Sequence, residues 1–141
     1  MKNLSFILIA LGLVAVTLYI SYFLPPKTSS SNVSTQNLKI IQYPLNGKTL
    51  SLYVADTPAK WEKGLMYFRK LEGVDGMIFI FSDKQIRTFW NKNTFMDLDM
   101  YWMNDSTVIG NDFLPSVEKQ GGIVTVTSPR PANKVIEVAA R

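Results

Sequence analysis

The chain has 141 residues, 47% hydrophobic and 18% charged, so it can bury the core of one small domain and is not intrinsically disordered. Its 15 basic and 11 acidic residues give a net charge of +4, but only Arg69 and Lys70 are adjacent, so no basic stripe of the nucleic-acid-binding kind is present. Cysteine and histidine are absent, which excludes disulfides, thiol nucleophiles, Ser-His-Asp triads and zinc or copper sites within this chain.

The N-terminal region predicts a membrane anchor. Residues 4–24 carry no charge, and a helix of that length, at about 1.5 Å per residue, matches the roughly 30 Å hydrocarbon thickness of a bilayer. The run ends in tyrosines and prolines rather than small residues, which favours an uncleaved signal-anchor over a cleaved signal peptide. Lys2 and the α-amino group outweigh Lys27 across the segment. We therefore expect a single pass through the cytoplasmic membrane, with the bilayer as partner of residues 4–24 and the domain on the extracytoplasmic side.

A linker and one folded domain follow the anchor. Residues 25–37 predict a flexible linker, because they are rich in Ser, Thr, Asn and Gln and have nothing to bury. Residues 38–141 predict a single domain. Asn46 and Gly47 predict a tight turn between its first two strands, and a proline-led segment predicts one short helix over residues 58–63.

The spacing of apolar residues in this domain is strand-like. Residues 77–81 are apolar on both faces, which predicts a central strand. The expected strands are residues 39–43, 50–55, 77–81, 86–90, 99–103, 107–113, 123–127 and 134–139. Short strands at intervals of ~8–12 residues predict an all-β fold, either a small barrel or a sandwich, with one short helix.

Several motifs, in the expected order, resemble domain-of-unknown-function family 192. They are Val54-Ala55-Asp56-Thr57-Pro58, Glu62-Lys63-Gly64-Leu65-Met66, Gly76-Met77-Ile78-Phe79, Phe89-Trp90-Asn91-Lys92-Asn93-Thr94 with Leu98-Asp99, and Val135-Ile136-Glu137-Val138. The resemblance covers about residues 38–141. It implies a small, jelly-roll-like all-β domain, often exported, with no established biochemical activity. One departure is Asn91, where the family usually has Met.

The densest group of polar residues, called here the polar cluster, lies between two apolar segments and is the candidate ligand-binding site. The candidate binding residues are Trp90, Lys92, Asn93, Thr94, Asp97 and Asp99, and the same dense stretch also contains Asn91. Lys92, Asn93 and Thr94 could present an amine, an amide and a hydroxyl to a polar ligand. The alternative is a turn in which the Asn and Thr side chains bond to the backbone.

Two carboxylates and three tryptophans leave further alternatives. If Asp97 and Asp99 both lie in a strand, they share a face and could bind a divalent cation or act as acid and base. Otherwise Asp97 ends a turn and Asp99 pairs with Lys92. A stacking platform for a sugar or a peptide, or a role in filling the core, is possible for Trp61, Trp90 and Trp102.

These observations leave three functional hypotheses. We favour a non-enzymatic, membrane-anchored binding or accessory module for a small polar ligand, a glycan or a protein partner. For it we expect no cofactor, no bound metal, no catalytic residue and no nucleic-acid partner. The first alternative is a hydrolase that uses Asp97 and Asp99, although no nucleophile with an adjacent base is visible. The second is a subunit of a membrane protein assembly.

Overall fold

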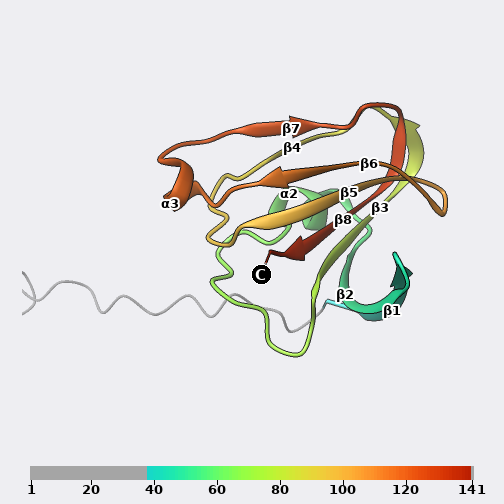
Figure 1. The fold of residues 1–141 in the computed structure, drawn as a ribbon, viewed down its shortest axis with the longest axis horizontal. Helices are drawn as coiled ribbons and strands as arrows, with labels where there is room; N and C mark the ends of the chain where they lie inside the picture. The colour runs from blue at the N-terminus through green and yellow to red at the C-terminus, as the bar shows by residue number, and fades with distance from the viewer. Residues whose placement is uncertain (1–37, 141) are drawn as a thin grey trace, which may run out of the picture. The chain divides into compact units, whose positions relative to one another are not determined.

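The computed structural model describes residues 38–140, which form eight strands and two short helices (Figure 1). In chain order the elements are β1 (Ile40–Leu45), β2 (Lys48–Ala55), α2 (Pro58–Lys63), β3 (Gly76–Gln85), β4 (Thr88–Trp90), β5 (Leu98–Asn104), β6 (Thr107–Leu114), α3 (Val117–Gln120), β7 (Thr125–Thr127) and β8 (Ala132–Ala139). The domain is therefore mostly β, and the expected all-β class is confirmed.

The predicted anchor over residues 4–24 and the predicted linker over residues 25–37 lie outside the described residues. Across residues 38–140, no helix combines the length and the apolar character needed to cross a bilayer. The anchor, its single pass and the location of the domain thus stay predictions from the sequence.

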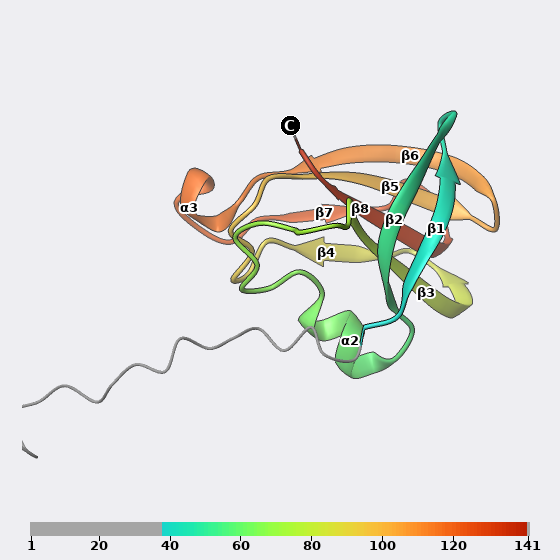
Figure 2. The same ribbon diagram turned by 90° about the horizontal axis from the view of Figure 1, so that it is seen from below.

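The strands form two sheets rather than one closed layer (Figures 1 and 2). The larger sheet has six strands in the order β1-β2-β3-β8-β5-β6, and a two-stranded ribbon pairs β4 with β7. All of these pairs are antiparallel except β2 with β3, which α2 and the following loop connect in parallel. Because β1 and β6 lie at opposite edges and the two shortest strands pair with each other, the sheet does not close. The barrel alternative was wrong for this reason.

Local signals placed the first elements correctly. Asn46 and Gly47 form the loop between Leu45 and Lys48, with φ values of 50° and 77°. Positive φ at both central residues matches the right-handed twist of a hairpin, and Asn-Gly tolerates it best. The helix α2 spans the predicted residues 58–63 and ends at Gly64.

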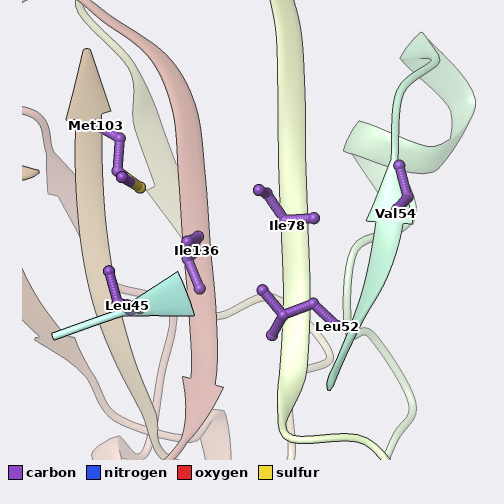
Figure 3. Close-up of a cluster of buried hydrophobic side chains, with 6 residues drawn as sticks. All are labelled: Leu45, Leu52, Val54, Ile78, Met103 and Ile136. Atoms are coloured by element: carbon purple, nitrogen blue, oxygen red, sulfur yellow. The ribbon is translucent and has the colours of Figure 1, made fainter. Parts of the chain in front are cut away.

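Strand β3 lies at the centre of the larger sheet, as its apolar sequence predicted, between β2 and β8. Its side chains alternate between two buried environments. On one face Ile78 joins the hydrophobic cluster shown in Figure 3, together with Leu45, Leu52, Val54, Met103 and Ile136.

The second face of the sheet is covered by the β4–β7 ribbon. Phe89 of β4 packs edge-on against Phe79, with ring centroids 4.8 Å apart, and against Trp102, with centroids 5.6 Å apart. Trp102 is fully buried and donates its indole N–H to Asp112 over 2.6 Å, so this tryptophan fills the core. The same alternation places Glu137 of β8 on this covered face, since it faces Met77 of β3 and Met100 of β5 in register.

Some element bounds and one helix differ from expectation. The strand expected over residues 86–90 begins at Thr88, and the one expected over residues 123–127 begins at Thr125. The helical turn α3 was not predicted; Ser116 stabilises its start by accepting a hydrogen bond from the Lys119 backbone N–H over 3.2 Å.

Candidate functional site

The central part of the polar cluster forms a tight turn. Asn93 has a φ of 52°, and the Thr94 backbone N–H donates to the Asn91 carbonyl over 3.0 Å. The Thr94 hydroxyl donates to the Lys92 carbonyl over 3.4 Å, and the Asn93 amide donates to the Tyr67 hydroxyl over 2.8 Å. The Thr94 contact is the side-chain-to-backbone bond of the turn alternative, whereas Asn93 bonds to a side chain instead of the backbone. Lys92 is exposed, with its ammonium 4.9 Å from the centre of the Trp90 ring.

The two carboxylates of the cluster are not brought together. Asp97 accepts hydrogen bonds from the Ser116 backbone N–H over 2.8 Å and from the Lys119 ammonium over 2.7 Å. The Lys119 hydrogen bond, followed by the one from Ser116, holds the pKa of Asp97 below its usual value.

Asp99 lies in β5 and borders a separate surface hollow, which it shares with Asp75 and Tyr101. Among residues 38–140, the ion pairs include Asp97 with Lys119 but none between Lys92 and Asp99. The residues of the polar cluster therefore lie in different surroundings and do not converge on one ligand.

Asn91, a departure from the family pattern within the dense polar stretch, is fully buried. Its amide donates to the carbonyls of Pro115, over 3.0 Å, and Gly122, over 3.2 Å. Its side-chain oxygen accepts from the Val124 backbone N–H over 2.9 Å. One side chain therefore joins the end of β4 to two segments that are distant in sequence, which is a structural role.

The hollow with the clearest chemical character lies over Glu137, and we call it the Glu137 hollow. It has a volume of about 360 Å³, within the usual size range of small-molecule sites. Its aromatic lining consists of Trp61, Phe79, Phe81, Phe89 and Trp90. The other lining side chains are Glu62, Lys63, Leu65, Met66, Ile86, Arg87, Thr88, Thr94 and Glu137. Of the six cluster residues, Trp90 and Thr94 line this hollow.

Glu137 is the unusual group in this hollow. The residue is 4% exposed, and no hydrogen bond or ion pair reaches its carboxyl from another residue between 38 and 140. Burial raises the pKa of Glu137 from 4.5 to about 8, because the charged form has lost its water. At neutral pH the group is therefore mostly a neutral carboxylic acid, which can donate one hydrogen bond and accept others.

The sequence analysis did not single out Glu137, although a signal was present. An acidic residue between Ile136 and Val138 interrupts an aliphatic strand, and it shares a face with Val135. Because Val135 is fully buried, the alternation directs Glu137 inward as well. A carboxyl with inward phase in an apolar strand is rare enough to indicate a site.

The rim of the hollow is formed by the end of α2 and the segment before β4. Gly64 has a φ of 46°, and a β-carbon there would lie 3.2 Å from the Phe79 ring. Glycine therefore lets the chain turn closely over the hollow. Arg87 has its guanidinium 3.9 Å from the centre of the Phe81 ring, forms an ion pair with Asp83, and donates to the Ala132 carbonyl over 3.2 Å.

This arrangement is suited to binding more than to catalysis. It offers an apolar, aromatic enclosure with one polar group at its base. Both threonine hydroxyls of the lining are engaged: that of Thr94 donates to the Lys92 carbonyl, and that of Thr88 shares a hydrogen bond with the Thr127 hydroxyl. Within the described chain, no nucleophile and base stand side by side at the hollow.

Residues 38–140 thus form a small β domain, in which an open six-stranded sheet and a short ribbon border an aromatic hollow with Glu137 at its base. Residues 41–141 match the model of the family DUF192, described as Uncharacterized ACR, so the chain belongs to that family. This confirms the resemblance seen in the sequence motifs.

Two solved structures are similar to this chain. A protein of Sinorhizobium meliloti 1021, named as a candidate transcription regulator, is 30% identical with a TM-score of 0.56 over 73% of this chain and 78% of that one. A protein of unknown function from Novosphingobium aromaticivorans DSM 12444 is 23% identical, with a TM-score of 0.54 over 72% of this chain and 81% of that one, and supports the fold alone. No curated protein shows significant similarity to the chain.

Proposed function

We propose that this domain is a non-enzymatic binding module that takes a small ligand into the Glu137 hollow. The observation that carries the proposal is the buried carboxyl of Glu137, which has no partner among the described residues and borders an open hollow. No fully enclosed side-chain oxygen or nitrogen of residues 38–140 lacks a hydrogen-bond partner, so the Glu137 carboxyl oxygens stay accessible at the hollow. A ligand with a complementary group would bond to them in place of water. The aromatic lining would supply the apolar contact area.

The proposal includes the location predicted from the sequence. A helix over residues 4–24 would hold the domain at the outer face of the cytoplasmic membrane, and residues 25–37 would give it reach. The support for this part is the uncharged N-terminal run and the bulky residues that end it.

The alternatives receive less support. A hydrolase that uses Asp97 and Asp99 would need both carboxylates at one substrate, yet they border separate hollows. The naming of the Sinorhizobium relative raises a role in transcription, but six basic side chains of residues 38–140 lie in ion pairs with acidic ones. We therefore retain the hypothesis that nucleic acid is not a partner.

The test is a screen of fragment-sized amines, alcohols and acids against the purified full chain, read by thermal shift and tryptophan fluorescence. Trp61 and Trp90 line the hollow, so a bound ligand should change their emission. Binding should weaken at least tenfold in Glu137→Gln and should persist in the matched control Asp99→Asn. Binding that weakens in Asp99→Asn and persists in Glu137→Gln would place the site at the polar cluster instead. The absence of any bound fragment would refute the proposal.

A further inference from the structure

The charged side chains around the Glu137 hollow differ in whether they already have partners. The segment before β4 contributes Arg87, which is held by Asp83, the Ala132 carbonyl and the Phe81 ring. The α2 segment contributes Glu62 and Lys63, both exposed at the rim. A ligand entering this hollow therefore meets one deep acidic group and no free cation at depth among the described side chains.

The strands beside Glu137 offer it no charge. Its neighbours in register are Met77 on β3 and Met100 on β5. One strand further out stand Tyr53, next to Met77, and Asp112, whose carboxyl already accepts from the Trp102 indole. Burial is the one cause of the raised pKa of Glu137, with no charge of the described chain contributing to it.

The aromatic rings of the lining already interact with cations. The guanidinium of Arg87 lies 3.9 Å from the centre of the Phe81 ring, and the ammonium of Lys92 lies 4.9 Å from the centre of the Trp90 ring. Aromatic faces attract cations through the ring quadrupole, and this attraction strengthens where water is excluded. Aromatic walls with one carboxyl at the base are complementary to a positively charged, partly apolar molecule.

We propose that the ligand of the Glu137 hollow is a small organic cation, an ammonium compound whose apolar part contacts the aromatic walls and whose charge meets the Glu137 carboxylate. The proposal rests on the proposed function and names the class of ligand for that same site. At the base of the hollow an anion would meet only the negative or neutral form of Glu137, since Lys63 lies at the rim and Arg87 is held by Asp83. A neutral ligand would leave the Glu137 carboxylate without an opposite charge, so ionisation of Glu137 would not raise the affinity for it.

Binding of a cation should be linked to the loss of one proton. The protonated carboxyl and the cation form a carboxylate–cation pair, and the carboxyl proton passes to the solvent. Since Glu137 has a pKa of about 8 in the empty domain, the affinity for a cation should rise steeply between pH 6 and pH 9 and then level off.

The experiment uses the full chain and three probes of similar shape: benzyltrimethylammonium, benzyl alcohol and phenylacetate. The charge of benzyltrimethylammonium does not titrate, so its pH dependence belongs to the protein. Calorimetric titration should show an affinity at least tenfold higher at pH 9 than at pH 6. In buffers of different ionisation heat, about one proton should be released per cation at pH 6.

Two variants assign the effect. Glu137→Gln should weaken the binding of benzyltrimethylammonium at least tenfold at pH 9 and should abolish both the pH dependence and the proton release. Asp99→Asn removes a carboxylate that borders a different hollow and should leave the binding, the pH dependence and the proton release unchanged. Thermal melting at pH 6 and at pH 9 shows whether the wild type and each variant are folded.

The outcomes separate this inference from the proposed function. Preferential, Glu137-dependent binding of benzyl alcohol or phenylacetate would overturn the cation class and leave a binding site in place. Binding of benzyltrimethylammonium with no pH dependence would also overturn it. If neither these probes nor the wider fragment screen gives binding at the hollow, the proposed function fails as well.

Discussion

The Glu137 hollow and the polar cluster differ in how far their polar groups are satisfied within the protein. In the cluster, Asn93, Thr94 and Asp97 each bond to a neighbouring group. In the hollow, Glu137 is as deeply buried as Thr94, but its carboxyl has no partner in the described part of the chain. A stretch rich in polar residues can thus form its hydrogen bonds internally. A single polar residue in an apolar strand has no such neighbours and can stay available to a ligand. The predictions below test this difference in order of expected effect.

The largest effect should come from the pH dependence that Glu137 imposes on stability. Its pKa is raised in the folded state from 4.5 to about 8, so its favourable contribution is complete below pH 4.5 and is lost as the pH rises to about 8. A shift of that size corresponds to about 5 kcal/mol in the free energy of unfolding. Glu137→Gln should therefore be several kcal/mol more stable than the wild type at pH 9 and similar to it at pH 4.

Urea denaturation of both proteins at pH 4, 6, 8 and 9 measures this difference. Glu62→Gln is the matched control and should follow the wild type at every pH, because Glu62 is exposed. A parallel pH dependence in the wild type and Glu137→Gln would show that the carboxyl is not buried in the way described.

The second effect should come from Asn91, which joins distant segments beside the cluster. Asn91→Met restores the residue type that the family pattern favours, but it leaves the Pro115 carbonyl, the Gly122 carbonyl and the Val124 N–H without their partner. Each unmet buried group costs about 1–3 kcal/mol, so we expect a loss of roughly 3 kcal/mol in stability. Asn93→Met, at a half-buried turn position with positive φ, should cost less, about 1–2 kcal/mol. Thermal or chemical denaturation would decide, and equal losses would contradict the assignment.

The parts of the fold that were predictable from the sequence depend on local signals. The Asn46-Gly47 turn and the helix over residues 58–63 are set by residues that are adjacent in the chain, and β3 by its apolar character on both faces. The failure to close into a barrel depends on β4 pairing with β7, which are far apart in sequence. Alternation alone cannot show which strands pair.

The candidate site was harder to predict for the same reason. Asn91 acts on residues 24 to 33 positions away, and no local pattern reveals such contacts. Glu137 could have been recognised from its phase in the last strand, since Val135 and Glu137 share a face. Its aromatic surroundings could not, because they are assembled from α2, β3 and the β4 segment.

A third, smaller effect should have the opposite sign of pH dependence. The Lys119 hydrogen bond and the Ser116 N–H lower the pKa of Asp97, so the stabilisation they give is present above its ordinary value of 3.8 and is lost as the pH falls below it. Because the Lys119 side chain is 60% exposed, solvent screens the pair, and Lys119→Met should cost about 1 kcal/mol or less at pH 7. The loss should shrink between pH 4 and pH 2. Urea denaturation across that range measures it, and a loss that grows in acid would contradict the pairing.

The smallest effect is expected for Lys92 and Asp99. The sequence left open whether these two residues form a buried ion pair. A buried ion pair would lose about 3–5 kcal/mol when either partner is removed, and the double variant would recover part of that loss. Lys92 is instead exposed, Asp99 is half-buried, and no ion pair joins them within residues 38–140. Lys92→Met and Asp99→Asn should each change stability by about 0.5 kcal/mol or less, and the two changes should add because neither side chain depends on the other.

Thermal melts of the two single variants and the double variant measure this. Compensation in the double variant would mean that Lys92 and Asp99 stabilise the fold as a pair. The polar cluster would then differ from the Glu137 hollow only in how deeply its charged groups are buried.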